Sequence, residues 1–143
     1  MYKDILIATD GSDLSTIAVK HGISLAKSLA AKVIAVNASE PFHWFDVNMV
    51  ADAEAAYAEG VSRLAVQALA VVSDAAKTAG VVCETFHVEK EHPYKAIIDL
   101  AKAKNCDLIV MASHGRRGVS AFVLGSETVK VLTHCNIPVL VCH

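Results

Sequence analysis

The sequence alternates five short apolar runs with longer segments in which apolar residues recur every three or four positions. The runs cover residues 3–9, 32–38, 81–87, 107–112 and 137–142. Such runs are typical of strands buried on both faces, and the segments between them are typical of amphipathic helices. The alternation predicts an α/β fold with a five-stranded, doubly wound parallel sheet. The chain has no linker, repeat or low-complexity tract, so residues 1–143 are expected to form a single domain.

The composition agrees with such a sheet and excludes several classes of protein. Apolar residues make up 54% of the chain, yet no apolar run reaches the roughly 18–20 residues of a membrane-spanning helix. A formal net charge of −2 favours neither a nucleic-acid nor a membrane partner. The N-terminus has no leader-like pattern, and the four cysteines have no CxxC or zinc-like spacing. We therefore expect a cytoplasmic protein with reduced thiols.

The first two helices carry signals for their ends and for a buried face. Ser12 or Asp13 is a suitable N-cap for the first helix, and Gly80 is suited to end the second. An apolar stripe at helical spacing in the second helix is predicted to face the core. Its members are Tyr57, Val61, Leu64, Ala68, Val72 and Ala75.

Two polar loops predict where a ligand binds. In open parallel sheets, ligands bind beyond the carboxyl ends of the strands, where the strand order reverses. A strand order of 3-2-1-4-5 places that reversal between the first and fourth strands. The loops that follow these strands are Asp10-Gly11-Ser12 and residues 112–115. The sequence therefore predicts one cleft built from two distant segments.

The second loop leads to a helix start at Gly125-Ser126-Glu127. Glycine lets the backbone approach an anion, and the free N–H groups of a helix N-terminus favour phosphate. Arg116 and Arg117 can add positive charge nearby. An ordinary loop followed by a helix cap has the same outline, so spacing alone leaves both phosphate binding and a purely structural role open.

At this point the sequence resembles a known family. The stretch Met-Ala-Ser-His-Gly-Arg-Arg-Gly from residue 111, the later Leu-Gly-Ser and the closing Ile-Pro-Val-Leu-Val look like the universal stress protein signature. The opening Ile-Leu-Ile-Ala-Thr-Asp-Gly-Ser matches as well, and the resemblance covers the whole chain. It implies a Rossmann-like fold of the adenine nucleotide alpha hydrolase type, with strand order 3-2-1-4-5.

The ATP-binding branch of that family carries Gly, two residues, Gly, nine residues, and then Gly followed by Ser or Thr. Gly115, Gly125 and Ser126 fit this spacing, whereas Ala112 stands at the first glycine. The added methyl group is sterically mild where φ is negative, although it can crowd the sugar or phosphate. The resemblance implies binding of ATP, or of AMP or ADP, together with Mg²⁺.

The resemblance also implies roles for individual residues. Asp10 should accept hydrogen bonds from the ribose hydroxyls, and the backbone of Ala38 should contact adenine. Residues 111–115 should surround the sugar and the first phosphates, and Gly125, Ser126 and Glu127 should face the outer phosphates. The complete predicted nucleotide site is Ala8, Thr9, Asp10, Ala38, Met111, Ala112, Ser113, His114, Gly115, Arg116, Gly125, Ser126 and Glu127.

Three classes of function remain open from the sequence. The leading hypothesis is a nucleotide-binding sensor or regulator of the stress response. The second is a slow ATPase or phosphotransferase, although we find no convincing general base, no catalytic carboxylate pair and no GxxxxGK[ST] loop, and assign no catalytic residue. The third is a dimeric interaction protein that binds no nucleotide, which Ala112 favours and the intact Gly115-to-Ser126 spacing opposes. The histidines show no metal-binding spacing, so no metal site is predicted.

The last apolar run suggests a partner. Residues 137–142 end the chain with almost no polar side chain. An apolar strand at a sheet edge tends to pair with another strand. We therefore predict a homodimer formed through this strand, which the family resemblance also implies.

Overall fold

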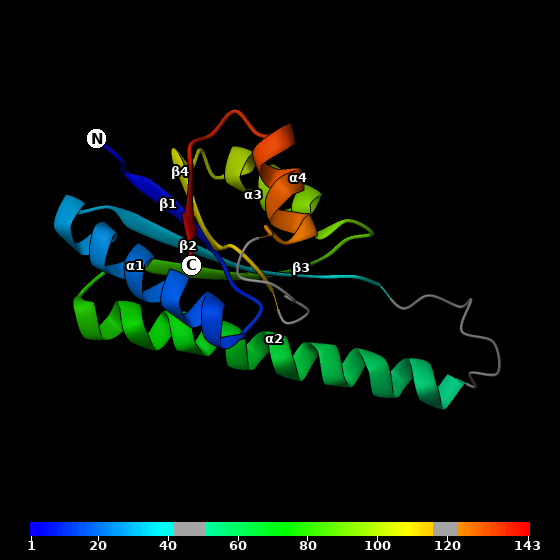
Figure 1. Cartoon of the computed structure of the whole chain (residues 1–143). Coiled ribbons are helices and arrows are strands. Elements are labelled where there is room, and N and C mark those ends of the chain that lie inside the picture. The colour runs from blue at the N-terminus through cyan, green and yellow to red at the C-terminus, as the bar shows by residue number, and fades with distance from the viewer. Residues whose placement is uncertain (42–50, 116–122) are drawn as a thin grey trace.

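The computed structural model describes residues 1–41, 51–115 and 123–143 and contains one five-stranded sheet (Figure 1). All four strand pairs are parallel, and the strand order is β3-β2-β1-β4-β5. The predicted fold class and strand order are therefore confirmed. The elements are β1 (Asp4–Ala8), α1 (Asp13–Leu29), β2 (Lys32–Ser39), α2 (Ala51–Ala79), β3 (Cys83–Glu89), α3 (Pro93–Ala103), β4 (Leu108–Ala112), α4 (Ser126–His134) and β5 (Val139–Cys142).

Helices cover both faces of the sheet (Figure 1). One buried cluster joins Ile5, Ile7 and Val110 of the sheet to residues of α1 and α2. The other joins Leu6 and Ile109 to residues of α3 and α4. Because successive strand residues point to opposite faces, the central strands β1 and β4 need apolar residues at every position, which explains their unbroken apolar runs.

Helix α1 begins and ends where local chemistry predicts. Ser12 is the N-cap, and its hydroxyl accepts the Ser15 N–H at 3.2 Å. The helix packs closely on the sheet at Gly22, where an added Cβ would lie 2.5 Å from Cδ1 of Ile7. Gly80 ends α2 with a φ of +73°, the left-handed conformation predicted for a glycine after a helix.

The predicted buried stripe of α2 is wrong in its first half. Ala68 and Val72 are buried, but Tyr57 and Leu64 are 39% and 44% exposed. The neighbouring Ala65 is only 1% exposed, so Leu64 is exposed because it points away from the packed face of the helix. Tyr57 belongs to the N-terminal turns of α2, which extend past the start of the neighbouring α1 (Figure 1). Along the rest of the helix, Ala65, Leu69 and Ala76 join the buried face.

The two edge strands differ in character. β3 carries exposed polar residues, as expected at a sheet edge, whereas β5 leaves Leu140 38% exposed. In the part of the chain that the structure describes, no helix has both the length and the apolar character needed to cross a membrane.

Candidate functional site at the carboxyl edge of the sheet

The loops after β1 and β4 meet at the carboxyl edge, as the sequence predicted. A Cβ added at Gly115 would lie only 2.7 Å from Oδ2 of Asp10. The Asp10 carboxylate therefore occupies the space that a side chain at position 115 would fill. This contact brings together two predicted site residues from loops more than 100 positions apart in the sequence.

Two hydrogen bonds from backbone N–H groups to side chains hold the loop that carries Asp10. Oδ1 of Asp10 accepts the Ser12 N–H at 2.9 Å, and Oγ1 of Thr9 accepts the Gly11 N–H at 3.2 Å. Thr9 is only 6% exposed, and its hydroxyl also bonds to the Ser15 hydroxyl at 3.1 Å. Gly11 has a φ of +80°, which allows the sharp turn. The loop thus fixes the direction of Asp10 before any ligand is present.

The second loop folds back against the start of α4. The Gly125 N–H donates to the Ser113 carbonyl at 2.7 Å, and the Thr128 hydroxyl donates to the Ala112 carbonyl at 2.9 Å. A Cβ at Gly125 would lie 3.2 Å from that Ser113 oxygen and 3.3 Å from Cα of His114. Since these are backbone atoms, a side chain at position 125 would force the two segments apart. Gly125 caps α4 without a side-chain hydrogen bond, so no side chain of its own competes for the first N–H groups of the helix.

His114 has one ring nitrogen satisfied and one unsatisfied. Nδ1 lies 3.0 Å from the Ser113 hydroxyl, and Nε2 is shielded from solvent without a hydrogen-bond partner among the described residues. A shielded polar nitrogen without a partner is costly. A ligand oxygen at this position would satisfy Nε2 whenever Nδ1 accepts from Ser113, because Nε2 then carries the proton.

Glu127 makes contacts that the sequence did not suggest. Its Oε2 accepts the Tyr94 N–H in the first turn of α3 at 2.8 Å, and its Oε1 lies 3.2 Å from Nζ of Lys130. Both carboxylate oxygens are therefore engaged within the protein. The Lys130 ammonium also lies 5.6 Å from the centroid of the Tyr94 ring.

The remaining predicted site residues lie around these loops in different roles. Ala8, Met111 and Ala112 are buried at the strand ends, and Ala38 is half-buried at the end of β2. Arg116 lies outside the described residues. Ser126 stands at the start of α4 beside Gly125.

Sequence reasoning missed Asn37. This residue is 7% exposed, and its Nδ2 donates to the Thr9 carbonyl at 3.0 Å. A polar residue within the otherwise apolar run 33–38 was the available signal, because a buried amide requires a partner.

No group of three or more His, Cys, Asp or Glu side chains in the described ranges could hold a metal ion. The four cysteines are unpaired. Burial raises the pKa of the Cys106 thiol to about 11, and the nearby Asp4 and Asp107 carboxylates act in the same direction. Cys106 is therefore a packing residue with little thiolate character.

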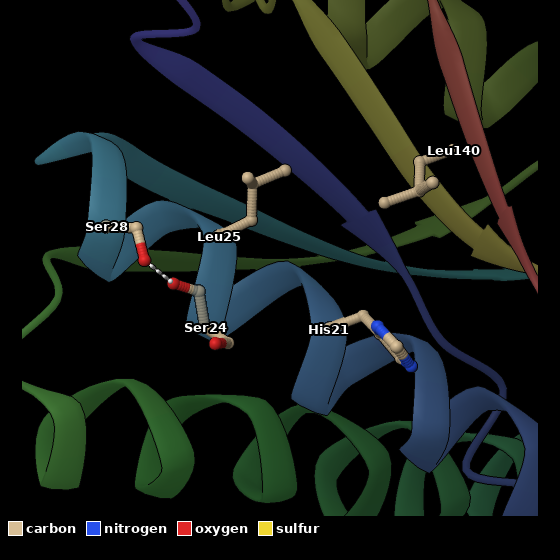
Figure 2. A pocket seen from close by; sticks show the side chains of 5 residues that line it. All are labelled: His21, Ser24, Leu25, Ser28 and Leu140. Atoms are coloured by element: carbon tan, nitrogen blue, oxygen red, sulfur yellow. Dashed lines mark hydrogen bonds between the residues drawn. The ribbon is translucent and has the colours of Figure 1, made fainter.

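A shallow hollow of about 280 Å³ lies apart from the predicted site, between α1 and β5. Figure 2 shows His21, Ser24, Leu25 and Ser28 along α1, with Leu140 of β5 across from them. None of these residues belongs to the predicted nucleotide site. The hollow instead borders the exposed apolar edge at β5.

Residues 1–143 match the sequence profile of the universal stress protein family. A universal stress protein of Methanocaldococcus jannaschii is 35% identical over 144 residues, which cover 99% of this chain and 82% of that protein. A universal stress protein of Thermus aquaticus is 32% identical, with 98% of both chains covered.

Two solved structures resemble this chain over nearly its whole length. The structure of a hypothetical protein designated MJ0577 has a TM-score of 0.83 and 27% identity to this chain. The match covers 99% of this chain and 96% of that protein's chain. A universal stress protein solved in complex with cAMP has a TM-score of 0.73 and 28% identity to this chain. The match covers 99% of this chain and 97% of that protein's chain. The profile match along the entire sequence, together with relatives of similar length, shows that this chain belongs to the universal stress protein family.

Proposed function

We propose that this protein binds an adenine nucleotide at the carboxyl edge of the sheet and acts as a nucleotide-dependent regulator of the stress response. The observation that carries the proposal is the close packing of Gly115 on Asp10 and of Gly125 on residues 113–114. A Cβ at position 115 would displace the Asp10 carboxylate, and one at position 125 would press on the backbone of Ser113 and His114. The missing side chains bring a carboxylate, a backbone loop and a helix N-terminus to one place, which suits a sugar joined to a phosphate.

Each group has a chemical role in the proposed site. The Asp10 carboxylate accepts hydrogen bonds from the ribose hydroxyls, and the strand end at Ala38 offers its backbone to the base. The Ser126 N–H and the N–H groups that follow it in the first turn of α4 bind phosphate at the positive end of the helix, beside Gly125. Nε2 of His114 has no hydrogen-bond partner among the described residues, which supports an acceptor oxygen of the ligand beside it. Arg116 keeps its predicted place beside the phosphates on the basis of sequence alone.

The contacts of Glu127 bear on how many phosphates the ligand carries. Glu127, which the resemblance places near the outer phosphates, is already bound to Tyr94 and Lys130. A ligand with one phosphate needs no contact with Glu127, and a universal stress protein of similar structure was solved in complex with cAMP. ATP and ADP remain candidate ligands, and Mg²⁺ would enter bound to their phosphates.

We also infer that a second copy of the chain pairs with the edge strand β5. Leu140 is 38% exposed on that strand, and Val129 and Leu132 are 44% and 43% exposed on α4. Exposed apolar side chains beside a free strand edge favour strand pairing. The unpaired cysteines support the reducing environment of the cytoplasm.

Calorimetry with nucleotide-stripped protein tests the proposal. ATP, ADP and AMP are titrated with and without Mg²⁺ into the wild-type protein and the Gly125→Asp variant. We expect saturable binding near one site per chain in the wild type and none in Gly125→Asp, because the new carboxylate meets the Ser113 carbonyl and repels phosphate. Gly60→Asp is the matched control, since this glycine of α2 is near only the Arg63 side chain.

The outcomes separate the three classes of function. Binding without turnover supports the regulator. Steady phosphate release that is lost in Gly125→Asp would favour the slow ATPase or phosphotransferase. Absence of heat up to millimolar nucleotide would refute nucleotide binding and favour an interaction protein. Light scattering at micromolar concentration tests the pairing through β5, and a monomer would contradict it.

A further inference from the structure

The hydrogen-bond ladder between β1 and β2 ends on a side-chain donor, the Asn37 amide. Ala8 and Val36 are the last paired residues, and the Thr9 N–H donates to the Val36 carbonyl at 2.9 Å. In a continued parallel ladder, the Ala38 N–H would donate next to the Thr9 carbonyl. Instead, the side-chain Nδ2 of Asn37 donates to that carbonyl at 3.0 Å. A side chain therefore replaces a backbone donor at the last step of the ladder.

This replacement affects the backbone of Ala38. Peptide groups of alternate residues in a strand point to the same side, so Ala38, like Val36, directs its N–H and carbonyl toward β1. The Thr9 carbonyl accepts the Asn37 amide, and among the residues that the structure describes the Ala38 N–H makes no ladder bond to β1. Asn37 is 7% exposed, which leaves little room for its amide to exchange its partner for water.

We propose that Asn37 is a positioning residue that keeps the Ala38 peptide free to read the edge of an adenine base. The inference rests on the proposed nucleotide site. The Ala38 N–H would donate to N1 of adenine, and the Ala38 carbonyl would accept from the 6-amino group. Asn37 does not touch the nucleotide; it acts by occupying the Thr9 carbonyl.

An apolar side chain at position 37 should reverse this arrangement. In Asn37→Leu the Thr9 carbonyl loses its donor, and the Ala38 N–H can close the ladder in its place. The fold then exchanges one hydrogen bond for another, so its stability changes little, whereas the base loses its donor. A purely structural asparagine would show the opposite pattern, with lower stability and unchanged recognition of the base.

Amide hydrogen exchange tests the first step without any nucleotide. In the nucleotide-free wild type, we expect the Ala38 amide to exchange at least tenfold faster than the Val36 amide. In Asn37→Leu its protection should approach that of Val36. The control is Ser39→Ala, two residues along the same strand, where the lost hydroxyl bonds His87 and not β1. Equal protection of Ala38 and Val36 in the wild type would overturn the inference, even if Asn37→Leu failed to fold.

Calorimetry with two ligands tests the second step. Asn37→Leu should weaken AMP binding by about tenfold, the loss of roughly one hydrogen bond. The affinity for 1-deaza-AMP, which has a C–H in place of N1, should stay the same in both proteins, and Ser39→Ala should match the wild type with both ligands. Equal weakening of AMP and 1-deaza-AMP would overturn the inference. If AMP does not bind the wild type at all, the proposed function fails, and that result is distinct from the exchange measurement.

Discussion

Helix α3 begins without a side-chain cap of its own, and Glu127 of α4 supplies one. The N-cap His92 makes no capping side-chain hydrogen bond, while the Glu127 carboxylate accepts the Tyr94 N–H at 2.8 Å. Loss of a cap typically costs about 1 kcal/mol. The carboxylate also faces the positive end of α3, worth roughly 0.3–1 kcal/mol. The pair with Lys130 is half-exposed and adds at most a few tenths of a kcal/mol, about what such surface pairs contribute.

We therefore expect Glu127→Ala to lower the free energy of unfolding by about 1.5 kcal/mol, a fall in Tm of about 3–6 °C for a domain of this size. Glu127→Gln should lose less, about 0.5 kcal/mol, because its amide oxygen still accepts the Tyr94 N–H. Urea unfolding followed by far-ultraviolet circular dichroism measures both changes.

The control for this prediction is Glu84→Ala. Glu84 pairs with Lys104 at 3.3 Å on the surface, with its side chain 61% exposed, so its loss should cost about 0–0.5 kcal/mol. If Glu127→Ala costs no more than Glu84→Ala, Glu127 does not cap α3. The same variant bears on function: unchanged nucleotide affinity would mean that Glu127 does not contact the outer phosphates.

Three further predictions concern packing, the site and the thiols. Gly22→Ala should cost about 1 kcal/mol in urea unfolding, because overpacking against Ile7 outweighs the gain in helix propensity. Ile7→Val should recover part of that loss, because it removes Cδ1 but keeps Cγ1, which would lie 2.9 Å from the new Cβ; simple addition of the two single costs would argue against the contact. Gly115→Ala should displace the Asp10 carboxylate and weaken AMP binding in calorimetry. In an Asp10→Ala background the same substitution should have no further effect, and additive losses of affinity would contradict the coupling between positions 10 and 115. The free energy of unfolding should fall as pH rises above about 9, because the unfolded Cys106 thiol ionises while the folded thiol, with its pKa raised to about 11, keeps its proton. Cys106→Ala should show a shallower fall with pH, and identical slopes in the two proteins would refute this contribution.

Much of the fold could be predicted because its signals are local and repeated. The apolar runs of β1 and β4 require burial on both faces, and that requirement leads directly to a parallel sheet between helices. The caps at Ser12 and Gly80 were predicted from residue type alone, because capping depends on neighbours within one turn. The stripe of α2 was predicted with an error, since Tyr57 and Leu64 have helical spacing but are exposed, whereas the neighbouring Ala65 is buried.

The candidate site shows the same division. Its two loops could be predicted from their glycines and polar residues, together with the rule that ligands bind where strand order reverses. The partners of individual side chains could not. Glu127 contacts the first turn of a different helix, and Asn37 contacts the end of a neighbouring strand.

The sequence by itself thus determined the order and type of the elements, the strand order through its family resemblance, and the two loops of the site. Tertiary structure alone decided that Asp10 lies against Gly115, that Glu127 caps α3, and that Asn37 donates to the Thr9 carbonyl. The physical reason is the range of the forces involved. Propensity, capping and hydrophobic periodicity act over a few residues, whereas these three contacts join groups that only the packed sheet and helices bring within hydrogen-bond distance.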